Sequence, residues 1–292
     1  MVTTEQIQFF DENGYLAYGK VIEPEDVEEL RAGLDRMIEL ELNGGDDSLP
    51  EFKFGHRRDK NQESRAITQF VNMFKREPAY RRLLHNPEIC ETAAALLHAL
   101  SVRLWHDQII SKPPEANGHF RFHQDFFFWP LAEPQIVSCW LALDDATVEN
   151  GCMHVISASH NNPDFSPEAR SAESARQAEA SETGEEFETY WDRMAKELAS
   201  IGKPIELKAG ECMFHHCLNF HATPQNTTDR QRRAHVMILM AEGMRVNLAQ
   251  SPGHVLVPNF EVEDGEPLVG KGHPVCDPDK WSGSVLGEPV VS

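Results

Sequence analysis

The sequence predicts an α+β domain, mainly β, in which helices pack outside a β core. Before residue 100, apolar residues recur at helical spacing, whereas from about residue 102 short β-rich runs alternate with Pro, Gly, Asn and Asp. Helices first and strands afterwards are typical of a β core with a helical cover. The 292 residues are enough to bury one large core.

The N-terminal region, 1–100, predicts a mainly helical buttress. Thr3 and Gln6 have the spacing of a capping box, and Gly14 is a stop signal, so a short first helix is expected. An extended segment should follow at 15–21, and a long amphipathic helix should begin at Pro24. Helical or mixed segments are expected at 65–75, 77–85 and 87–99.

The core strands are expected where apolar and β-branched residues form short runs. These runs are 102–110, 119–126, 136–143, 153–156, 204–207, 211–214 and 234–240. Residues 161–200 interrupt them with an acidic, partly helical insertion, either a solvated surface excursion or an active-site lid. Without a repeat or linker, we expect one domain over 1–292, with its β core in 101–160 and 201–245 and a C-terminal extension at 246–292.

The charge balance excludes several kinds of partner. Lys and Arg number 27 against 47 Asp and Glu, so the net charge of −20 repels nucleic acid and anionic membranes. The first residues lack a signal-peptide pattern and no apolar run is long enough to span a bilayer, so we expect a cytoplasmic protein. The six cysteines lack CxxC spacing, which favours reduced, mostly buried thiols.

A candidate metal site begins in the stretch FRFHQDFFFWP. His123 and Asp125 are two residues apart, so in an extended strand their side chains share a face. A His-x-Asp pair is expected to occur about once by chance in a chain of this composition. It therefore indicates a metal site only if the chain supplies a third ligand. Two imidazoles and one carboxylate form the facial triad of non-haem Fe(II) oxygenases, which leaves positions for a co-substrate and O2.

A later stretch, GECMFHHCLNFHATPQNTTDRQRRAHVMILM, offers the missing histidine. Its histidines are His215, His216, His221 and His235. Its basic run consists of Arg230, Arg232 and Arg233. An arginine near the metal suits the far carboxylate of a 2-oxo acid, because its planar fork grips a carboxylate in two places.

Four blocks resemble the phytanoyl-CoA dioxygenase family of Fe(II)/2-oxoglutarate-dependent oxygenases. The blocks are EQIQFFDENGYLAYGKVIEPEDVEELRAGLD, DQIISKPPEANGHFRFHQDFFFWP, WLALDDATVENGCMHVISASH and HATPQNTTDRQRRA. The resemblance implies a double-stranded β-helix (a cupin-like jelly roll) buttressed by N-terminal helices. It also implies that His123, Asp125 and His221 are the catalytic iron ligands.

The resemblance further implies a 2-oxoglutarate pocket. The family's arginine follows its distal histidine by eleven positions, which lands on Arg232, and Thr223 is expected to bond the same carboxylate. Gln108 and Trp140 match positions that line this pocket, although one residue of slippage in a strand would reverse their face.

The implied reaction is hydroxylation of an aliphatic C–H in a small molecule by Fe(II), 2-oxoglutarate and O2, with succinate and CO2 as by-products. Related halogenases replace the ligand carboxylate with a small residue, so Asp125 indicates oxygen transfer. Two alternatives stay open: a cupin-type metal dioxygenase that does not use 2-oxoglutarate, and a catalytically silent binding protein on the same fold. We expect a monomer or a homodimer.

Substrate contacts are less sharply indicated. Phe127 or Trp129 is expected to touch the substrate, with the other aromatic residues of FFFW in the core. Arg121 shares the strand face of the metal pair, and either fixes an anionic group of the substrate or forms a plain ion pair.

Several further residues have two interpretations. Lys112 either reaches the co-substrate or substrate or is an exposed lysine beside two prolines, and Gln69 and Asn72 are expected to reach the pocket from a helix. The remaining histidines are expected to be packed or hydrogen-bonded rather than metal ligands: His106, His119, His154, His160, His216 and His235.

Overall fold

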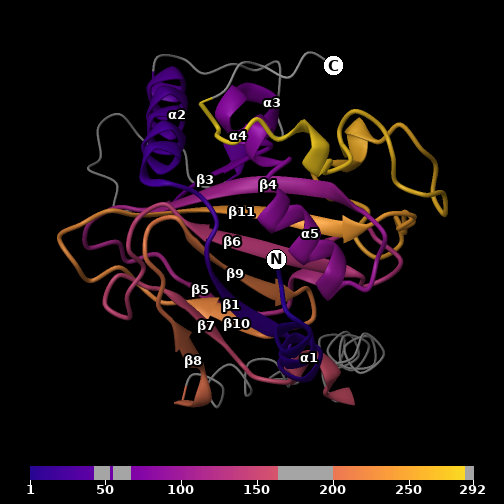
Figure 1. The fold of residues 1–292 in the computed structure, drawn as a ribbon, viewed down its shortest axis with the longest axis horizontal. Helices are drawn as coiled ribbons and strands as arrows, with labels where there is room; N and C mark the ends of the chain where they lie inside the picture. Colours follow the sequence, from indigo (N-terminus) through magenta and orange to yellow (C-terminus); the bar gives the residue numbers. More distant parts are fainter. Residues whose placement is uncertain (43–52, 55–66, 164–199, 287–292) are drawn as a thin grey trace, which may run out of the picture.

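The structure is a computed structural model that describes residues 1–42, 53–54, 67–163 and 200–286. Its centre consists of two antiparallel sheets (Figure 1). The larger has the order β1 (Tyr15–Lys20), β9 (Glu211–His216), β6 (Ile136–Ala142), β11 (Arg232–Ala241), β4 (Val102–Lys112), β3 (Thr68–Val71) and β2 (Lys53–Phe54). The smaller has the order β5 (Phe120–His123), β10 (His221–Thr223), β7 (Met153–Val155) and β8 (Lys203–Ile205).

From β4 onwards the chain passes repeatedly between the two sheets. β4, β6, β9 and β11 form the middle of the larger sheet, and β5, β7, β8 and β10 form the smaller one. This alternation is the winding of a jelly roll. The predicted double-stranded β-helix is therefore confirmed.

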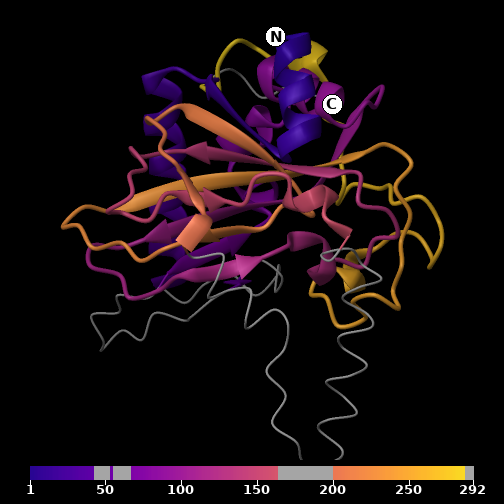
Figure 2. The ribbon, with the colours of Figure 1, turned by 90° about the horizontal axis from the view of Figure 1, so that it is seen from below.

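The helices cover the larger sheet on its outer face, and the smaller sheet lies on its other side (Figure 2). They are α1 (Thr4–Asn13), α2 (Pro24–Leu42), α3 (Met73–Arg76), α4 (Pro78–Leu83) and α5 (Pro87–Leu96). The capping box between Thr3 and Gln6 is present, and Gly14 ends α1 in the left-handed conformation at φ 76°. Both signals are local, which is why the sequence located this helix correctly.

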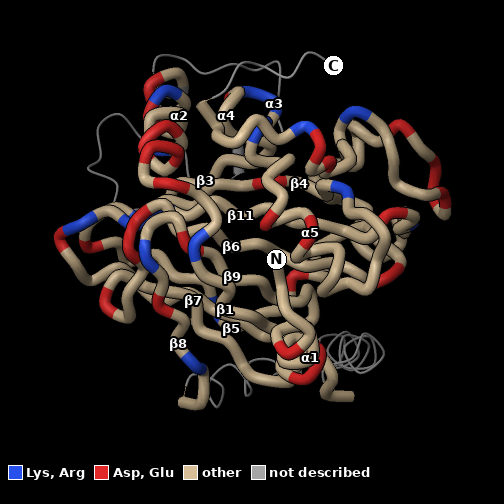
Figure 3. Tube along the Cα trace, in the orientation of Figure 1, with Lys and Arg blue, Asp and Glu red and all other residues tan. Residues whose placement is uncertain are grey.

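The centre of the larger sheet is apolar. Every residue of β6 is buried, because β11 and β9 flank it within the sheet and α5 contacts it from outside. Figure 3 shows charged residues mostly on helices and loops, with the strands largely free of them. All six cysteines are buried free thiols, as expected. None of the described helices combines the length and the apolar character needed to cross a bilayer.

Three features differ from the expectations. Residues 68–71 form strand β3 between β4 and β2, because pairing with these strands determines their conformation. The strand expected at 119–126 ends at His123, and a 3-10 helix, Asp125–Phe128, follows. The short strand β10 was not expected. The insertion at 161–200 lies almost wholly outside the described residues.

Candidate metal centre and anion pocket

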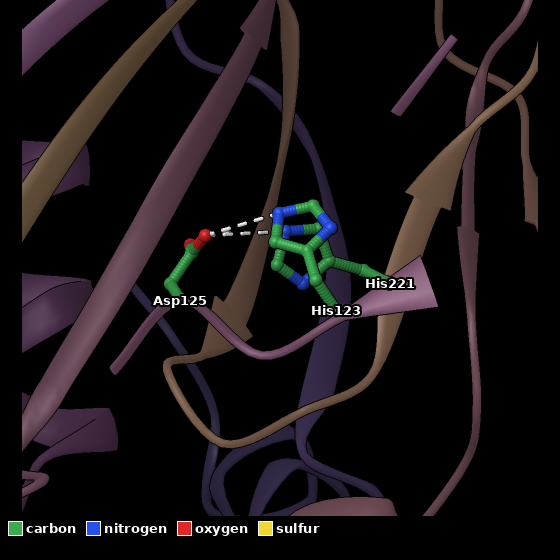
Figure 4. Close-up of side chains that lie close together, drawn as sticks. All are labelled: His123, Asp125 and His221. Carbon is green, nitrogen blue, oxygen red and sulfur yellow. Dashed lines mark ion pairs between the residues drawn. The ribbon is translucent and has the colours of Figure 1, made fainter. Parts of the chain in front are cut away.

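Strand pairing brings the three predicted metal ligands together. His123 ends β5 and lies opposite His221 of β10, so both imidazoles reach the same side of the smaller sheet. Gln124 keeps extended dihedrals (φ −115°, ψ 130°), which carries the alternation on to Asp125 at the start of the 3-10 helix. Asp125 Oδ1 lies 3.3 Å from His123 Nε2 and 3.6 Å from His221 Nε2 (Figure 4).

The residues between the ligands anchor this loop to the core. Gln124 is fully buried and donates to the Leu218 carbonyl at 2.6 Å, while the Phe126 amide donates to the Cys217 carbonyl at 3.2 Å. Even-numbered residues thus hold the segment in place, while His123 and Asp125 face the cavity.

Backbone carbonyls fix the tautomers of both histidines. His123 Nδ1 lies 2.7 Å from the Arg121 carbonyl, and His221 Nδ1 lies 3.0 Å from the Asn219 carbonyl. Because a carbonyl only accepts, each Nδ1 carries the proton, which places the lone pair on the Nε2 that faces Asp125. Burial lowers the pKa of His221 to about 3, so this imidazole is neutral, as a metal ligand must be.

Asp125 is held in its ionised form. Burial opposes ionisation, but the positive charge that the neighbouring imidazoles, His221 above all, carry when protonated outweighs it, so the pKa of Asp125 lies well below its usual range. The ligand atoms of His123, Asp125 and His221 all lie within 4.8 Å of one another. Two imidazoles and one carboxylate in this arrangement fit a ferrous ion.

His215 is a site residue whose place the sequence did not reveal. It lies on β9, is 1% exposed, and its Nε2 is 3.5 Å from Asp125 Oδ2. Its ring centroid is 4.3 Å from that of His221. The only available signal was its membership of the histidine-rich stretch, because the pairing of β9 with β1 and β6 decides which neighbouring histidine faces the metal site.

Two buried basic residues lie together at another part of the site. Arg232 and Lys112 are direct partners on β11 and β4, and both are fully buried. Lys112 Nζ donates to the backbone and side-chain oxygens of Thr223 at 2.9 and 3.0 Å, and also to the Pro224 carbonyl. Lys112 is therefore not the exposed lysine of one interpretation.

Arg232 has the features of an anion-binding residue. Among the described residues, none of its three guanidinium nitrogens has a hydrogen-bond partner, and its Cζ lies 5.4 Å from the centroid of the Trp140 ring. Burial lowers the pKa of Arg232 to about 10. Burying a cation without a partner is costly, so these donors fit a carboxylate that binds between Arg232, Trp140 and Thr223.

One cavity of about 640 Å³ connects the metal ligands with Trp140 and Thr223, and Arg232 and Lys112 are not among its lining residues. Its lining includes the three metal ligands, His215, Trp140, Thr223 and Gln108. Gln69 also lines it and donates to Gln108 Oε1 at 2.5 Å, but from strand β3 rather than from a helix. Asn72 is buried outside the lining, just before α3, with its backbone amide bonded to the Asp107 carbonyl.

The predicted substrate-side residues divide into two groups. Arg121 and Trp129 line the cavity, whereas Phe127 does not and packs against the core instead. Phe128 takes its place and is 52% exposed. The 3-10 helix is the reason, because it breaks the two-residue alternation on which the choice of Phe127 depended.

Most of the remaining histidines are packed, as expected. His216 accepts from the Leu218 amide at 3.1 Å, and His235 bonds to Asp107 at 2.9 Å in the core. His106 and His119 line the cavity, which the sequence did not indicate. The C-terminal extension also reaches the site, since Ser251, Gly253, His254, Val255 and Leu256 belong to the lining.

Comparison with known proteins identifies the family of this chain. Residues 10–234 match the family model "Phytanoyl-CoA dioxygenase (PhyH)". Phytanoyl-CoA dioxygenase 1 of Oryza sativa subsp. japonica is 26% identical over 267 residues, covering 80% of this chain and 87% of the rice protein. Phytanoyl-CoA dioxygenase domain-containing protein 1 of Rattus norvegicus is 28% identical, covering 64% of this chain and 60% of the rat protein.

Solved structures share the fold. The non-heme alpha ketoglutarate dependent carbocyclase SnoK from nogalamycin biosynthesis superposes with a TM-score of 0.71 at 24% identity, covering 94% of this chain and 96% of SnoK. EctD from S. alaskensis with 2-oxoglutarate and 5-hydroxyectoine gives 0.64 at 18% identity, covering 91% and 85%. Because the family model matches most of its length, this chain belongs to the phytanoyl-CoA dioxygenase family of Fe(II)- and 2-oxoglutarate-dependent oxygenases.

Proposed function

We propose that this protein hydroxylates an aliphatic carbon of a small molecule, with conversion of 2-oxoglutarate to succinate and CO2. The observation that carries the proposal is the cavity that connects a His-Asp-His cluster with Thr223 and Trp140. Arg232, whose Cζ lies 5.4 Å from the centroid of the Trp140 ring, has no hydrogen-bond partner for its guanidinium among the described residues. The His-Asp-His cluster would bind a metal, and the arginine donors would bind one carboxylate of a dicarboxylate.

His123, Asp125 and His221 would hold the iron. The protonated Nδ1 atoms of the two histidines keep both Nε2 lone pairs on the metal side, and the carboxylate supplies one negative charge. Bound iron, together with 2-oxoglutarate and O2, supplies the oxidising power for hydroxylation. A carboxylate at Asp125, in place of the small residue that related halogenases carry, favours oxygen transfer.

Arg232 and Thr223 would orient the co-substrate by its far carboxylate. The guanidinium offers several N–H donors, and the two bonds from Lys112 hold Thr223 in position. Because Arg232 and Lys112 are fully buried, water is excluded from this end and the charge of Arg232 acts at low dielectric. Burial and the neighbouring Arg232 lower the pKa of Lys112 to about 6, so Lys112 serves mainly as a hydrogen-bond donor at neutral pH. Gln108 and Trp140 would form the side walls.

The first test is succinate formation. Purified protein loaded with Fe(II) is incubated with 2-oxoglutarate and O2, with and without candidate substrates, and succinate is measured against a chelator-treated control. Substrate-stimulated succinate is expected. A substrate oxidised without succinate would support a cupin-type dioxygenase, and no O2-dependent decarboxylation at all would support a binding protein.

The second test identifies the outcome at carbon. Mass spectrometry of the product after reaction under isotopically labelled O2 should show the gain of one labelled oxygen atom. The structurally similar proteins include a carbocyclase and an epimerase. A product with a new ring or an inverted centre and no added oxygen would therefore overturn hydroxylation while keeping the enzyme class.

A further inference from the structure

Strand β4 runs along the cavity, so residues at different positions on this strand mark the two ends of the cavity. Because side chains alternate, His106, Gln108, Ile110 and Lys112 share one face, and the first three of them line the cavity. Six residues of strand span about 20 Å. Lys112 lies at the end next to Arg232, so His106 marks the opposite end, which the dicarboxylate would leave for the substrate.

The C-terminal extension forms the wall at the His106 end. His254 lies against this strand, with ring centroids 6.4 Å from His106 and 5.4 Å from Trp105, and Trp129 packs edge-on to His106 at 6.1 Å. Gln250 ties the extension to the 3-10 helix by donating to the Phe126 and Trp129 carbonyls at 2.8 and 2.9 Å. This wall lies beyond residue 234, where the family match ends.

His106 and His254 provide hydrogen-bonding groups without charge. Burial lowers the pKa of His106 to about 3 and that of His254 to about 4. The Leu256 amide donates to His254 Nδ1 at 3.3 Å, so the proton of this neutral imidazole is on Nε2, which is a donor. His106 is 5% exposed, and its Nδ1 is buried without a partner among the described residues.

Charged groups are scarce in the rest of the lining. Among the described lining residues, Arg121 is the only cation and the metal ligand Asp125 is the only acid. Arg121 is exposed, so water screens its charge. An acyl-CoA carries several phosphate charges, which need several Arg or Lys donors, and the net charge of −20 repels such a polyanion.

We propose that the His106 end binds an uncharged, largely apolar substrate through a hydroxyl or carbonyl group that hydrogen-bonds to His106 and His254. The rings of Trp129 and Phe128 and the side chains of Val255 and Leu256 pack against its hydrocarbon part. This inference rests on the proposed function for the position of the co-substrate. Among the described lining residues, none except Arg121 offers the cationic donors that the phosphates of a coenzyme A thioester need, so such thioesters are not the expected substrates.

The test compares four probes on the anaerobic Fe(II)–2-oxoglutarate protein by calorimetry: 2-naphthol, naphthalene, 2-naphthoate and octanoyl-CoA. We expect 2-naphthol to bind about tenfold more tightly than naphthalene, the size of effect expected for hydrogen bonds in a buried site, and more tightly than either anion. In His106→Phe and His254→Phe, this tenfold preference should fall to less than about threefold, with naphthalene affinity retained.

Two further variants control the test. His106→Gln keeps a donor and an acceptor and should retain part of the preference, and His98→Phe, at an exposed histidine on the surface, should leave it unchanged. Tighter binding of 2-naphthoate or octanoyl-CoA, equal or absent binding of all four probes, or an unchanged preference in both Phe variants would overturn the inference. Anaerobic 2-oxoglutarate binding is measured separately, and its absence would count against the proposed function instead.

Discussion

Replacing Arg232 with methionine should have two effects of opposite sign. Methionine fills a similar volume but removes the buried charge and all of its donors. We expect Arg232→Met to weaken 2-oxoglutarate binding strongly and, without ligand, to stabilise the fold. A merely structural arginine would not produce this combination, because its removal would lower the stability of the ligand-free protein.

The magnitudes follow from the burial of Arg232. A carboxylate held by two charge-assisted hydrogen bonds is worth about 3–5 kcal/mol, so Kd for 2-oxoglutarate should rise roughly a hundred- to several-thousand-fold. Burial lowers the pKa of Arg232 to about 10, a cost on the order of 3 kcal/mol to the folded state. The guanidinium is charged at neutral pH in both the folded and the unfolded state, so the folded wild type bears this cost in full. The methionine variant has no charge at this position and does not bear it.

Chemical denaturation and thermal unfolding of the Fe(II)-loaded protein under anaerobic conditions measure both effects. At 100 times Kd, 2-oxoglutarate should add about 2.7 kcal/mol to the unfolding free energy of the wild type. At the same concentration, Arg232→Met should gain almost nothing. Its ligand-free form should be more stable by about 1–3 kcal/mol.

Arg233→Met is the matched control. Arg233 is the next residue on β11, but its Nε and Nη2 bond to Asp144 at 2.8 and 2.9 Å. Its loss should lower stability and leave the response to 2-oxoglutarate intact. If Arg232→Met keeps the full 2-oxoglutarate response, the dicarboxylate binds elsewhere and the assignment of this pocket is wrong.

Three further predictions concern the metal centre and the wall. Asp125→Ala should abolish substrate-dependent succinate formation, as should a chelator, and added Fe(II) should restore only the chelated wild type; full turnover by the variant would remove Asp125 from the ligand set. His215→Leu should weaken Fe(II) binding by about 10- to 100-fold in a metal titration, because Asp125 loses a neighbour that orients it; unchanged affinity would show that His215 only packs. Gln250→Leu should cost about 1–3 kcal/mol in urea denaturation, because the Trp129 carbonyl loses the Gln250 donor and the Phe126 carbonyl keeps only the Trp129 amide. An unchanged midpoint would mean that the wall does not depend on this residue.

Local signals in the sequence determined the elements that depend on near neighbours. The capping box of Thr3 and Gln6, the stop at Gly14 and the extended spacing of His123 and Asp125 each involve residues within a few positions of one another. The short runs after residue 102 indicated an antiparallel β core, and the family resemblance supplied the jelly roll and His221. The structure retains these local features because the contacts that form them are made between residues close in the sequence.

Only the tertiary structure decided which side chains share the cavity. Strand register turned His215 toward Asp125, and the pairing of β4 with β11 buried Lys112 beside Arg232. Because of the 3-10 helix, Phe128 rather than Phe127 lines the cavity. The fold of the C-terminal extension places the ring of His254 next to that of His106. Periodicity assigns residues to faces, but the contacts between faces arise from pairing and packing of segments that are far apart in the chain.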